Sequence, residues 1–233
     1  MSFEQSSSAI VHLAWERLLG LADGALAEAS ATRSPRLEKI TRSGDSASFI
    51  RLFGGSVLSG PEWFLQRASG LSDEKLTLSG LLAIGQDHGA RSVGSAELFF
   101  ADDLEVINPE EEVVVSLDKA ELEQLRAASP ADDVNESGIL ELDHQFTMML
   151  AEQSIASAGY RQWQGLLAQL SVLVDPQLRR NGYGFTVAGI AAHEALGAGL
   201  IPQWRASVDN PASKALAEKL GFIHAGSQTT VVF

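Results

Sequence analysis

Hydrophobic positions recur at helical spacing close to the start of the chain. Within residues 9–22, AIVHLAWERLLGLA, apolar side chains return every three or four positions and polar ones lie between them. This spacing predicts an amphipathic helix. His12 and Trp15 lie within it, and we expect both to pack in the core rather than to take part in chemistry.

Extended and helical patterns alternate through the rest of the first hundred residues. Extended stretches are predicted at 36–41, 48–58 and 91–101, and helices at 62–68, directly after Pro61, and at 76–88. The alternation predicts an N-terminal α/β domain over residues 1–110. No motif in it indicates a site.

An acidic stretch from Asp102 to Glu112 separates the two halves of the chain. A calcium-binding loop would need alternating oxygen ligands and a turn glycine, and the stretch has neither. A solvated linker is the favoured interpretation. The second domain is therefore predicted to cover residues 111–233.

The second half repeats the alternation with longer apolar runs. Strands are predicted at 113–115, 166–174 and 202–208, and a hairpin is predicted from 146–150 and 155–160. Helices are predicted at 119–128 and 211–220, and an alanine-rich helix is predicted to end near residue 197.

Composition and charge restrict the function classes. The 233 residues are 45% hydrophobic, which is enough for a buried core. The net charge of −13 disfavours binding to nucleic acids or to anionic membranes, and it suits a cationic substrate. The absence of cysteine excludes disulfides, cysteine-ligated metals and thiol nucleophiles. Without a signal peptide or a long apolar run, a cytoplasmic protein is expected.

The segment from Leu170 to Phe222 carries the candidate chemistry. Its apolar strand breaks at Asp175-Pro176 and is followed by Arg179-Arg180-Asn181-Gly182-Tyr183-Gly184 and an alanine-rich helix. Glycines let backbone N–H groups approach a phosphate, and a helix N-terminus and two arginines add positive charge. The pattern predicts a pyrophosphate site, and the alternative is a tight strand-to-helix turn without a ligand.

Other phosphate-binding and catalytic motifs fit less well. The chain has no Gly-Lys dipeptide, which excludes a Walker loop. Val187 stands where a dinucleotide fingerprint needs glycine or alanine, so a nucleotide-binding oxidoreductase is the weaker alternative. His193-Glu194 begins like a zinc-protease motif, but Gly197 replaces its second histidine, and no metal is expected.

Two motifs in this segment carry a resemblance to a known family. The first is R-x-x-G-x-G after a strand ending in Val-x-Pro, and the second is N-P-A-S-x-x-L-x-x-x-L-G-F from Asn210 to Phe222. From about Ala120 to Phe233 the sequence resembles the GNAT superfamily of acetyl-CoA-dependent N-acetyltransferases.

The resemblance implies an α/β (α+β) fold. A central mixed, mostly antiparallel twisted sheet would be flanked by helices and end in a strand pair. The additional N-terminal α/β domain has an order of strands and helices compatible with a degenerate GNAT-like half. A homodimer is also compatible with the family.

The resemblance also assigns cofactor contacts for acetyl-CoA. The backbone of Val172, Leu173 and Val174 would pair with the pantetheine arm. The pyrophosphate would lie on the loop and the helix start, formed by Arg179, Arg180, Asn181, Gly182, Tyr183, Gly184 and Phe185. Asn210 and Ser213 would lie near the arm, with plain helix capping as the alternative.

The implied reaction is direct attack by a primary amine of a small molecule or peptide on the acetyl thioester. The N–H of Val174 would stabilise the oxyanion, and Glu136 and His144 are the candidate bases, each with a solvated surface role as the alternative. Many family members carry a tyrosine where this chain has Ala217. A non-catalytic acyl-CoA-binding regulatory module is therefore the alternative function.

Overall fold

The computed structural model describes residues 3–107 and 113–233, which form two compact units. Unit 1 contains Phe100–Trp204 and Ala215–Ile223, and unit 2 contains Glu4–Phe99, Arg205–Lys214 and His224–Phe233. Four elements contribute residues to both units, namely β4 (Arg91–Phe100), β9 (Ile201–Ser207), α8 (Pro211–Leu220) and β10 (Ile223–Val232). The domain boundary expected after residue 110 lies outside the described residues and stays a prediction.

Unit 1 is built on strands in the order β9-β8-β7-β6-β5. Their bounds are β5 (Val114–Ser116), β6 (His144–Leu150), β7 (Gln153–Trp163) and β8 (Leu167–Val174). Strands β5 to β8 pair antiparallel, whereas β8 and β9 pair parallel. The expected mixed, mostly antiparallel sheet flanked by helices is confirmed.

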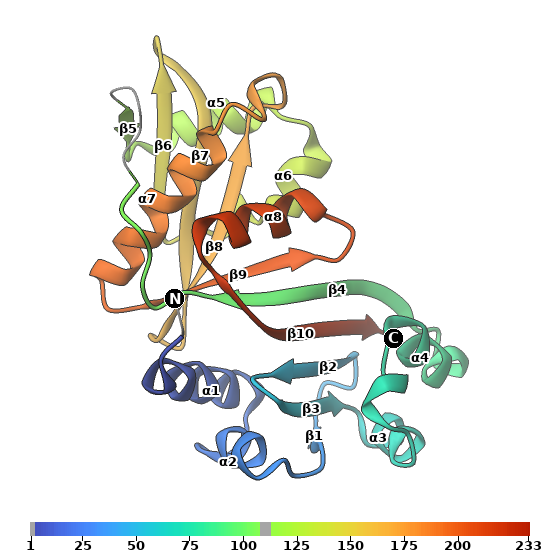
Figure 1. Ribbon diagram of the computed structural model, residues 1–233. Helices are drawn as coiled ribbons and strands as arrows, with labels where there is room; N and C mark the ends of the chain where they lie inside the picture. The colour runs from blue at the N-terminus through green and yellow to red at the C-terminus, as the bar shows by residue number, and fades with distance from the viewer. Residues whose placement is uncertain (1–2, 108–112) are drawn as a thin grey trace. The chain divides into compact units, whose positions relative to one another are not determined.

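Helices cover both faces of this sheet (Figure 1). α7 (Tyr183–Gly197) lies against β6, β7 and β8, while α5 (Lys119–Ala128) and α6 (Ala131–Ser137) pack on the opposite face, where 3-10 turn η3 (Ile139–Glu141) follows. Leu173 of β8 joins a core cluster with residues of these last elements, namely Leu122, Leu125, Val134 and Ile139. Because side chains alternate across a strand, Val172 and Val174 face α7.

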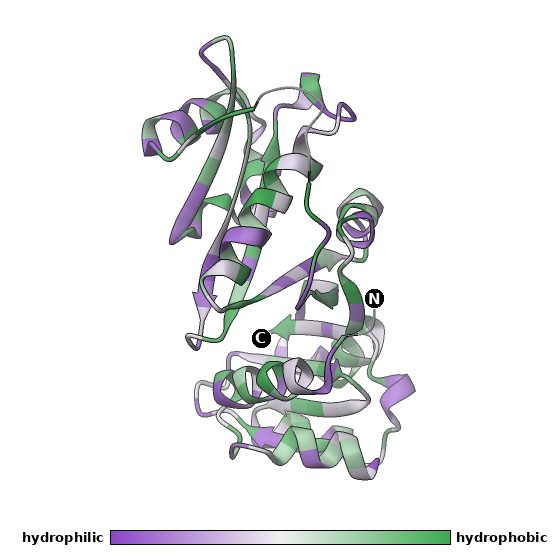
Figure 2. Ribbon diagram, turned by 60° about the vertical axis from the view of Figure 1, so that its left-hand side comes forward, coloured by the Kyte–Doolittle hydropathy of each residue, from purple (hydrophilic) through white to green (hydrophobic). Residues whose placement is uncertain are grey.

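Unit 2 has the strand order β1-β3-β2-β10-β4. Its strands are β1 (Leu37–Ile40), β2 (Ser46–Leu52), β3 (Gly55–Gly60) and β4 (Arg91–Phe100), and its helices are α1 (Gln5–Leu19), α2 (Ala25–Thr32), α3 (Glu62–Ala68), α4 (Leu78–Ile84) and the 3-10 turns η1 (Asp73–Lys75) and η2 (Gln86–His88). Hydrophobic and hydrophilic residues alternate along the helical ribbons in Figure 2, as expected for helices that bury one face.

Several elements differ from those expected. The extended stretch at 48–58 is the hairpin β2–β3, because Phe53 and Gly54 both adopt positive φ values, 46° and 91°, and turn the chain. α2 and α6 were not predicted. The expected final strand pair is the single strand β10, which pairs antiparallel with β2 of the N-terminal half. In this pairing Ser48 lies opposite Thr230, 182 positions away in sequence, and their side-chain hydroxyl oxygens form a hydrogen bond of 2.8 Å.

The described part of the acidic stretch is not solvated throughout. Leu104 is buried at 7% exposure and approaches Gly221 at the end of α8. An apolar side chain at this position attaches the segment to unit 1. None of the helices in the described residues has the length and apolar character needed to cross a membrane.

Candidate active site

The candidate site begins where β8 and β9 stop pairing. Their parallel register joins Leu167–Gln169 with Ile201–Gln203 and ends there in the described part of the chain. β8 continues to Val174 while it remains paired with β7 on its other side. The end of β8 therefore has one paired edge and one edge without β9.

Backbone groups of Val172 and Val174 face that second edge. The Asp175 N–H donates to the Ile155 carbonyl of β7 at 2.9 Å. In an antiparallel pair the direction of the backbone groups alternates from residue to residue. Leu173 therefore points its N–H and C=O toward β7. Of the three residues expected to pair with a pantetheine arm, Val172 and Val174 have backbone groups on the open edge.

Two glutamine side chains lie where the pairing ends. The Gln203 Nε2 donates to Gln169 Oε1 at 2.7 Å, and Gln169 Nε2 donates to the carbonyl oxygen of Leu170 at 2.9 Å. By the same alternation the Leu170 carbonyl faces the β9 side. The side-chain amide of Gln169 thus donates to the Leu170 carbonyl, which a backbone N–H of β9 would otherwise have to reach. The two strands can therefore separate while this acceptor keeps a hydrogen bond.

The loop after β8 delivers a helix N-terminus to the same place. Asp175 Oδ1 accepts from the Gln177 N–H at 2.8 Å, which starts the turn. Gly182 is the N-cap of α7 and provides no side-chain cap, and the first helical bond runs from the Thr186 N–H to the Gly182 carbonyl at 3.1 Å. The N–H groups of 182–185 therefore have no carbonyl partner within the helix. With no acidic residue in its first turn, this helix start is suited to an anion.

The two glycines of the loop serve different needs. Gly182 has a φ of 85°, and a Cβ built there meets no atom of the described residues within 4 Å. The backbone conformation, together with open space beside it, accounts for glycine at this position. A Cβ at Gly184 would lie 3.1 Å from Val174 Cγ2, so glycine lets the first turn of α7 approach the end of β8.

Arg179 is held away from these N–H groups. Its Nη2 lies 2.6 Å from Asp133 Oδ2 of α6, and its Nε donates to the Val174 carbonyl at 3.4 Å. Arg180 is exposed, with a φ of 70°, and Asn181 donates from its side chain to the Leu178 carbonyl at 3.1 Å. The loop geometry thus places one arginine on the open edge of β8.

The candidate base Glu136 lies on α6, on the same side as this contact. Asp133 and Glu136 are three residues apart, so they share a face of the helix. Asp133 contacts Arg179, which in turn contacts Val174. Glu136 is exposed and lies one helical turn after Asp133, on the same face of α6.

His144 lies elsewhere on the sheet. On β7, His144 pairs with Tyr160, whereas Val174 pairs with Ala156, four positions away. His144 and Val174 are therefore separated by two strand spacings across the sheet and by about 13 Å along the strand direction. The His144 ring stacks on Tyr160 with centroids 4.7 Å apart. Burial is the main cause that raises the pKa of the Tyr160 phenol, which therefore stays neutral near pH 7. The register does not bring His144 to Val174.

The second motif forms a capped helix. Asn210 Oδ1 accepts from the Ser213 N–H at 2.9 Å, the expected N-cap bond of α8. Gly221 ends the helix with a φ of 97°. Ala217 has 0% exposure, so a tyrosine at this position would have to displace its neighbours.

Comparison with known proteins adds to this geometry. Residues 112–222 match the sequence profile of the Acetyltransferase (GNAT) family. This part of the chain is a GNAT domain. No curated protein sequence matches the chain.

Solved structures are similar to this chain at low sequence identity. A GCN5-related N-acetyltransferase-like protein from Streptococcus suis is 19% identical, with a TM-score of 0.51, and the match covers 81% of this chain and 84% of that one. A putative GNAT-family acetyltransferase from Novosphingobium aromaticivorans is 21% identical with a TM-score of 0.48, covering 61% and 67%. A Bacillus subtilis acetyltransferase, solved in complex with CoA, is 12% identical with a TM-score of 0.39, covering 52% and 98%. The chain spans 60% and 63% of two further GNAT structures, from Colwellia psychrerythraea and Kribbella flavida.

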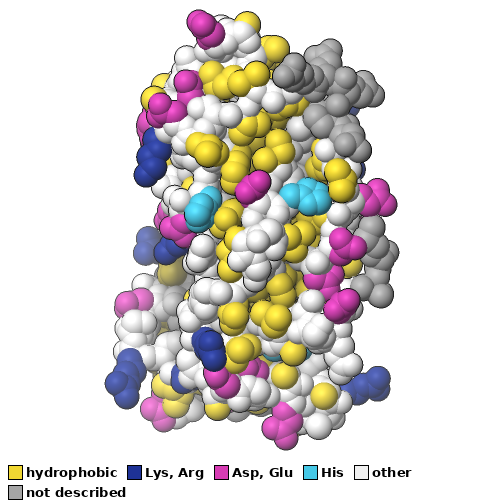
Figure 3. All heavy atoms as spheres, turned by 90° about the vertical axis from the view of Figure 1, so that its left-hand side faces the viewer, with side chains coloured by type: hydrophobic (Ala, Val, Ile, Leu, Met, Phe, Trp, Pro, Cys, Tyr) yellow, Lys and Arg dark blue, Asp and Glu magenta, His cyan; other side chains and the backbone are white. Residues whose placement is uncertain are grey.

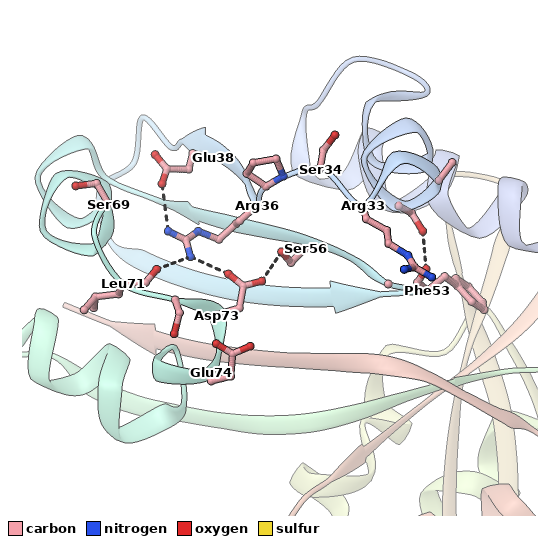
Figure 4. Close-up of a pocket in the computed structure, with 15 residues that line it drawn as sticks. Arg33, Ser34, Arg36, Glu38, Phe53, Ser56, Ser69, Leu71, Asp73 and Glu74 are labelled. Atoms are coloured by element: carbon pink, nitrogen blue, oxygen red, sulfur yellow. Dashed lines mark hydrogen bonds and ion pairs between the residues drawn. The ribbon is translucent and has the colours of Figure 1, made fainter.

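Unit 2 holds a separate polar pocket of about 1030 Å³ (Figure 4). At its floor the Arg36 side chain, 9% exposed, bonds Asp73 Oδ1 at 2.8 Å and the Leu71 carbonyl at 3.2 Å. Asp73 Oδ2 also accepts from Ser56 Oγ at 2.6 Å, and Glu38 lies 3.4 Å from Arg36. Arg36 thus bridges two carboxylates, and these contacts join β1, β3 and the α3–η1 segment.

The candidate site contains three structural features that sequence reasoning missed. They are the Asp133 contact to Arg179, the Gln169–Gln203 pair and α6 itself. For α6 a local signal exists, since Pro130 followed by two aspartates in the first turn is typical of a helix start. The other two depend on contacts 46 and 34 positions apart in sequence, which no local signal encodes. Within residues 3–107 and 113–233, no three His, Asp or Glu side chains are grouped so as to hold a metal ion.

Proposed function

We propose that this protein is an N-acetyltransferase that transfers the acetyl group of acetyl-CoA to a primary amine of a small molecule or peptide by direct attack. The observation that carries the proposal is the open edge of β8 next to the uncapped start of α7. Backbone groups of Val172 and Val174 fit the amides of a pantetheine arm, and the N–H groups of 182–185 fit a pyrophosphate. The space beside Gly182 leaves room for it.

Acetyl-CoA would supply an activated acyl group with a thiolate leaving group. The residues of the chain would orient the amine, remove a proton from it and stabilise negative charge on the acetyl oxygen. We assign the last role to the Val174 N–H, which faces the open edge, and proton removal to Glu136 rather than to His144. The chain has no cysteine that could form an acyl intermediate. Direct attack is consistent with that composition.

The charge of the protein favours a cationic acceptor. The net charge is −13, and acidic side chains are spread among hydrophobic ones over the face shown in Figure 3. A negative surface raises the local concentration of ammonium groups. We therefore propose an amine that carries positive charge at neutral pH, in a protein that works in the cytoplasm without nucleic-acid, membrane or metal partners.

The test is a calorimetric titration of the protein with acetyl-CoA, on the wild type and on Gly182→Glu. A carboxylate at the N-cap of α7 occupies the proposed pyrophosphate position and repels it, so at least a tenfold loss of affinity is expected. Gly182→Asn is the matched control, since asparagine tolerates a positive φ and carries no charge. Equal affinity of all three proteins, or no binding by the folded wild type, would leave the loop as a turn without a ligand.

A release assay for free CoA with a panel of amines then tests catalysis. The protein adds no thiol background, because it lacks cysteine. The second candidate function, a non-catalytic acyl-CoA-binding module, is favoured by the buried Ala217 at the place of the family tyrosine. Tight binding without turnover of any amine in the panel would support that module and contradict the enzyme.

A further inference from the structure

Arg179 lies over the open edge rather than over the helix start. Its Nε donates to the Val174 carbonyl, one of the backbone groups that β9 leaves uncovered, and its Nη2 is bound by Asp133. The guanidinium therefore stands where a pantetheine amide would have to donate. Two of its five N–H donors, the one on Nε and one on Nη2, are engaged in these contacts and are not available to a pyrophosphate on the α7 start while both contacts persist.

We propose that Asp133 is a positioning residue that holds Arg179 across the open edge and releases it when acetyl-CoA binds. This inference rests on the proposed function of the same site. A pyrophosphate offers Arg179 stronger charge-assisted hydrogen bonds than a single carboxylate does. Binding thus exchanges the Asp133 contact for a phosphate contact, and the Val174 carbonyl becomes available to the pantetheine arm.

The exchange also connects cofactor binding to the base. Asp133 and Glu136 share one face of α6, and the turn that follows the helix packs tightly on β8, where a Cβ at Gly138 would lie 3.1 Å from Ser171 Oγ. Loss of the Arg179 contact removes the ion pair that fixes this face beside the open edge.

The experiment compares Asp133→Asn with Asp132→Asn. Both remove one negative charge from the first turn of α6, but Asp132 is exposed and is not the carboxylate that binds Arg179. The Arg179 and Asp133 side chains are 46% and 31% exposed, which places their pair in the weak, solvent-screened class. Asp133→Asn is expected to bind acetyl-CoA about two- to fivefold more tightly than Asp132→Asn by calorimetry at low salt.

Two further measurements separate competition from a structural effect. The gain in affinity should shrink toward onefold at 0.5 M salt, because screening weakens the Asp133 contact in the wild type. In an Arg179→Ala background, Asp133→Asn should add nothing beyond Asp132→Asn. Equal affinity of Asp133→Asn and Asp132→Asn, weaker binding by Asp133→Asn, or a gain that persists without Arg179 would overturn the inference. If the folded wild type fails to bind acetyl-CoA at all, the proposed function itself is wrong.

Discussion

At the residue scale, the two candidate bases lie on different elements, Glu136 on helix α6 and His144 on strand β6. Glu136 lies on the α6 face that contacts Arg179, whereas His144 lies two strands away and stacks on Tyr160. Glu136→Gln is expected to lower kcat/KM by about a hundredfold or more, the usual contribution of a general base. His144→Gln should change kcat/KM by less than threefold. The reverse order in steady-state assays over pH 5 to 9 would assign the base to His144.

At the element scale, α2 depends on a carboxylate from another helix. Its N-cap is Gly24, which has no side chain, and buried Glu16 of α1 accepts from the N–H groups of Gly24 and Leu26 at 2.6 and 2.7 Å. Glu16→Gln keeps the shape but replaces one accepting oxygen with a donor. The free energy of unfolding should fall by about 1–3 kcal/mol, measured by urea denaturation. Glu28→Gln, exposed in the first turn of the same helix, is the control and should cost at most about 0.5 kcal/mol. Equal losses would mean that the capping bonds contribute nothing specific.

At the scale of the whole molecule, the net charge of −13 predicts how the rate depends on salt. Attraction of a polycation by a negative surface is screened beyond about 8 Å at physiological ionic strength. For accepted amines, kcat/KM should fall as sodium chloride increases, and more steeply for spermidine than for a monoamine such as benzylamine. The same assay with both amines is its own control. A slope that does not depend on the charge of the amine would show that the surface field does not steer the acceptor.

The whole-molecule arrangement also limits what the order of elements can predict. The helices at 62–68, 119–128 and 211–220 are predicted within two residues, since each has local start and stop signals. The hairpin at Phe53-Gly54 is not predicted, because phenylalanine rarely takes a positive φ. Nor is the placement of β10 beside β2, since strand partners far apart in sequence leave no local pattern.

The sequence by itself determined the class of fold, the strand–loop–helix that bears the glycines and arginines, and the GNAT resemblance. Those features are encoded in periodicity, in capping residues and in short motifs, all of which act over neighbouring positions. Only the tertiary structure decided which backbone groups of β8 face away from β7, which carboxylate binds Arg179 and how far His144 lies from Val174. These features depend on strand register and on contacts between segments that are distant in sequence. A shift of one residue in the register of β8 would turn its side chains to the opposite face of the sheet.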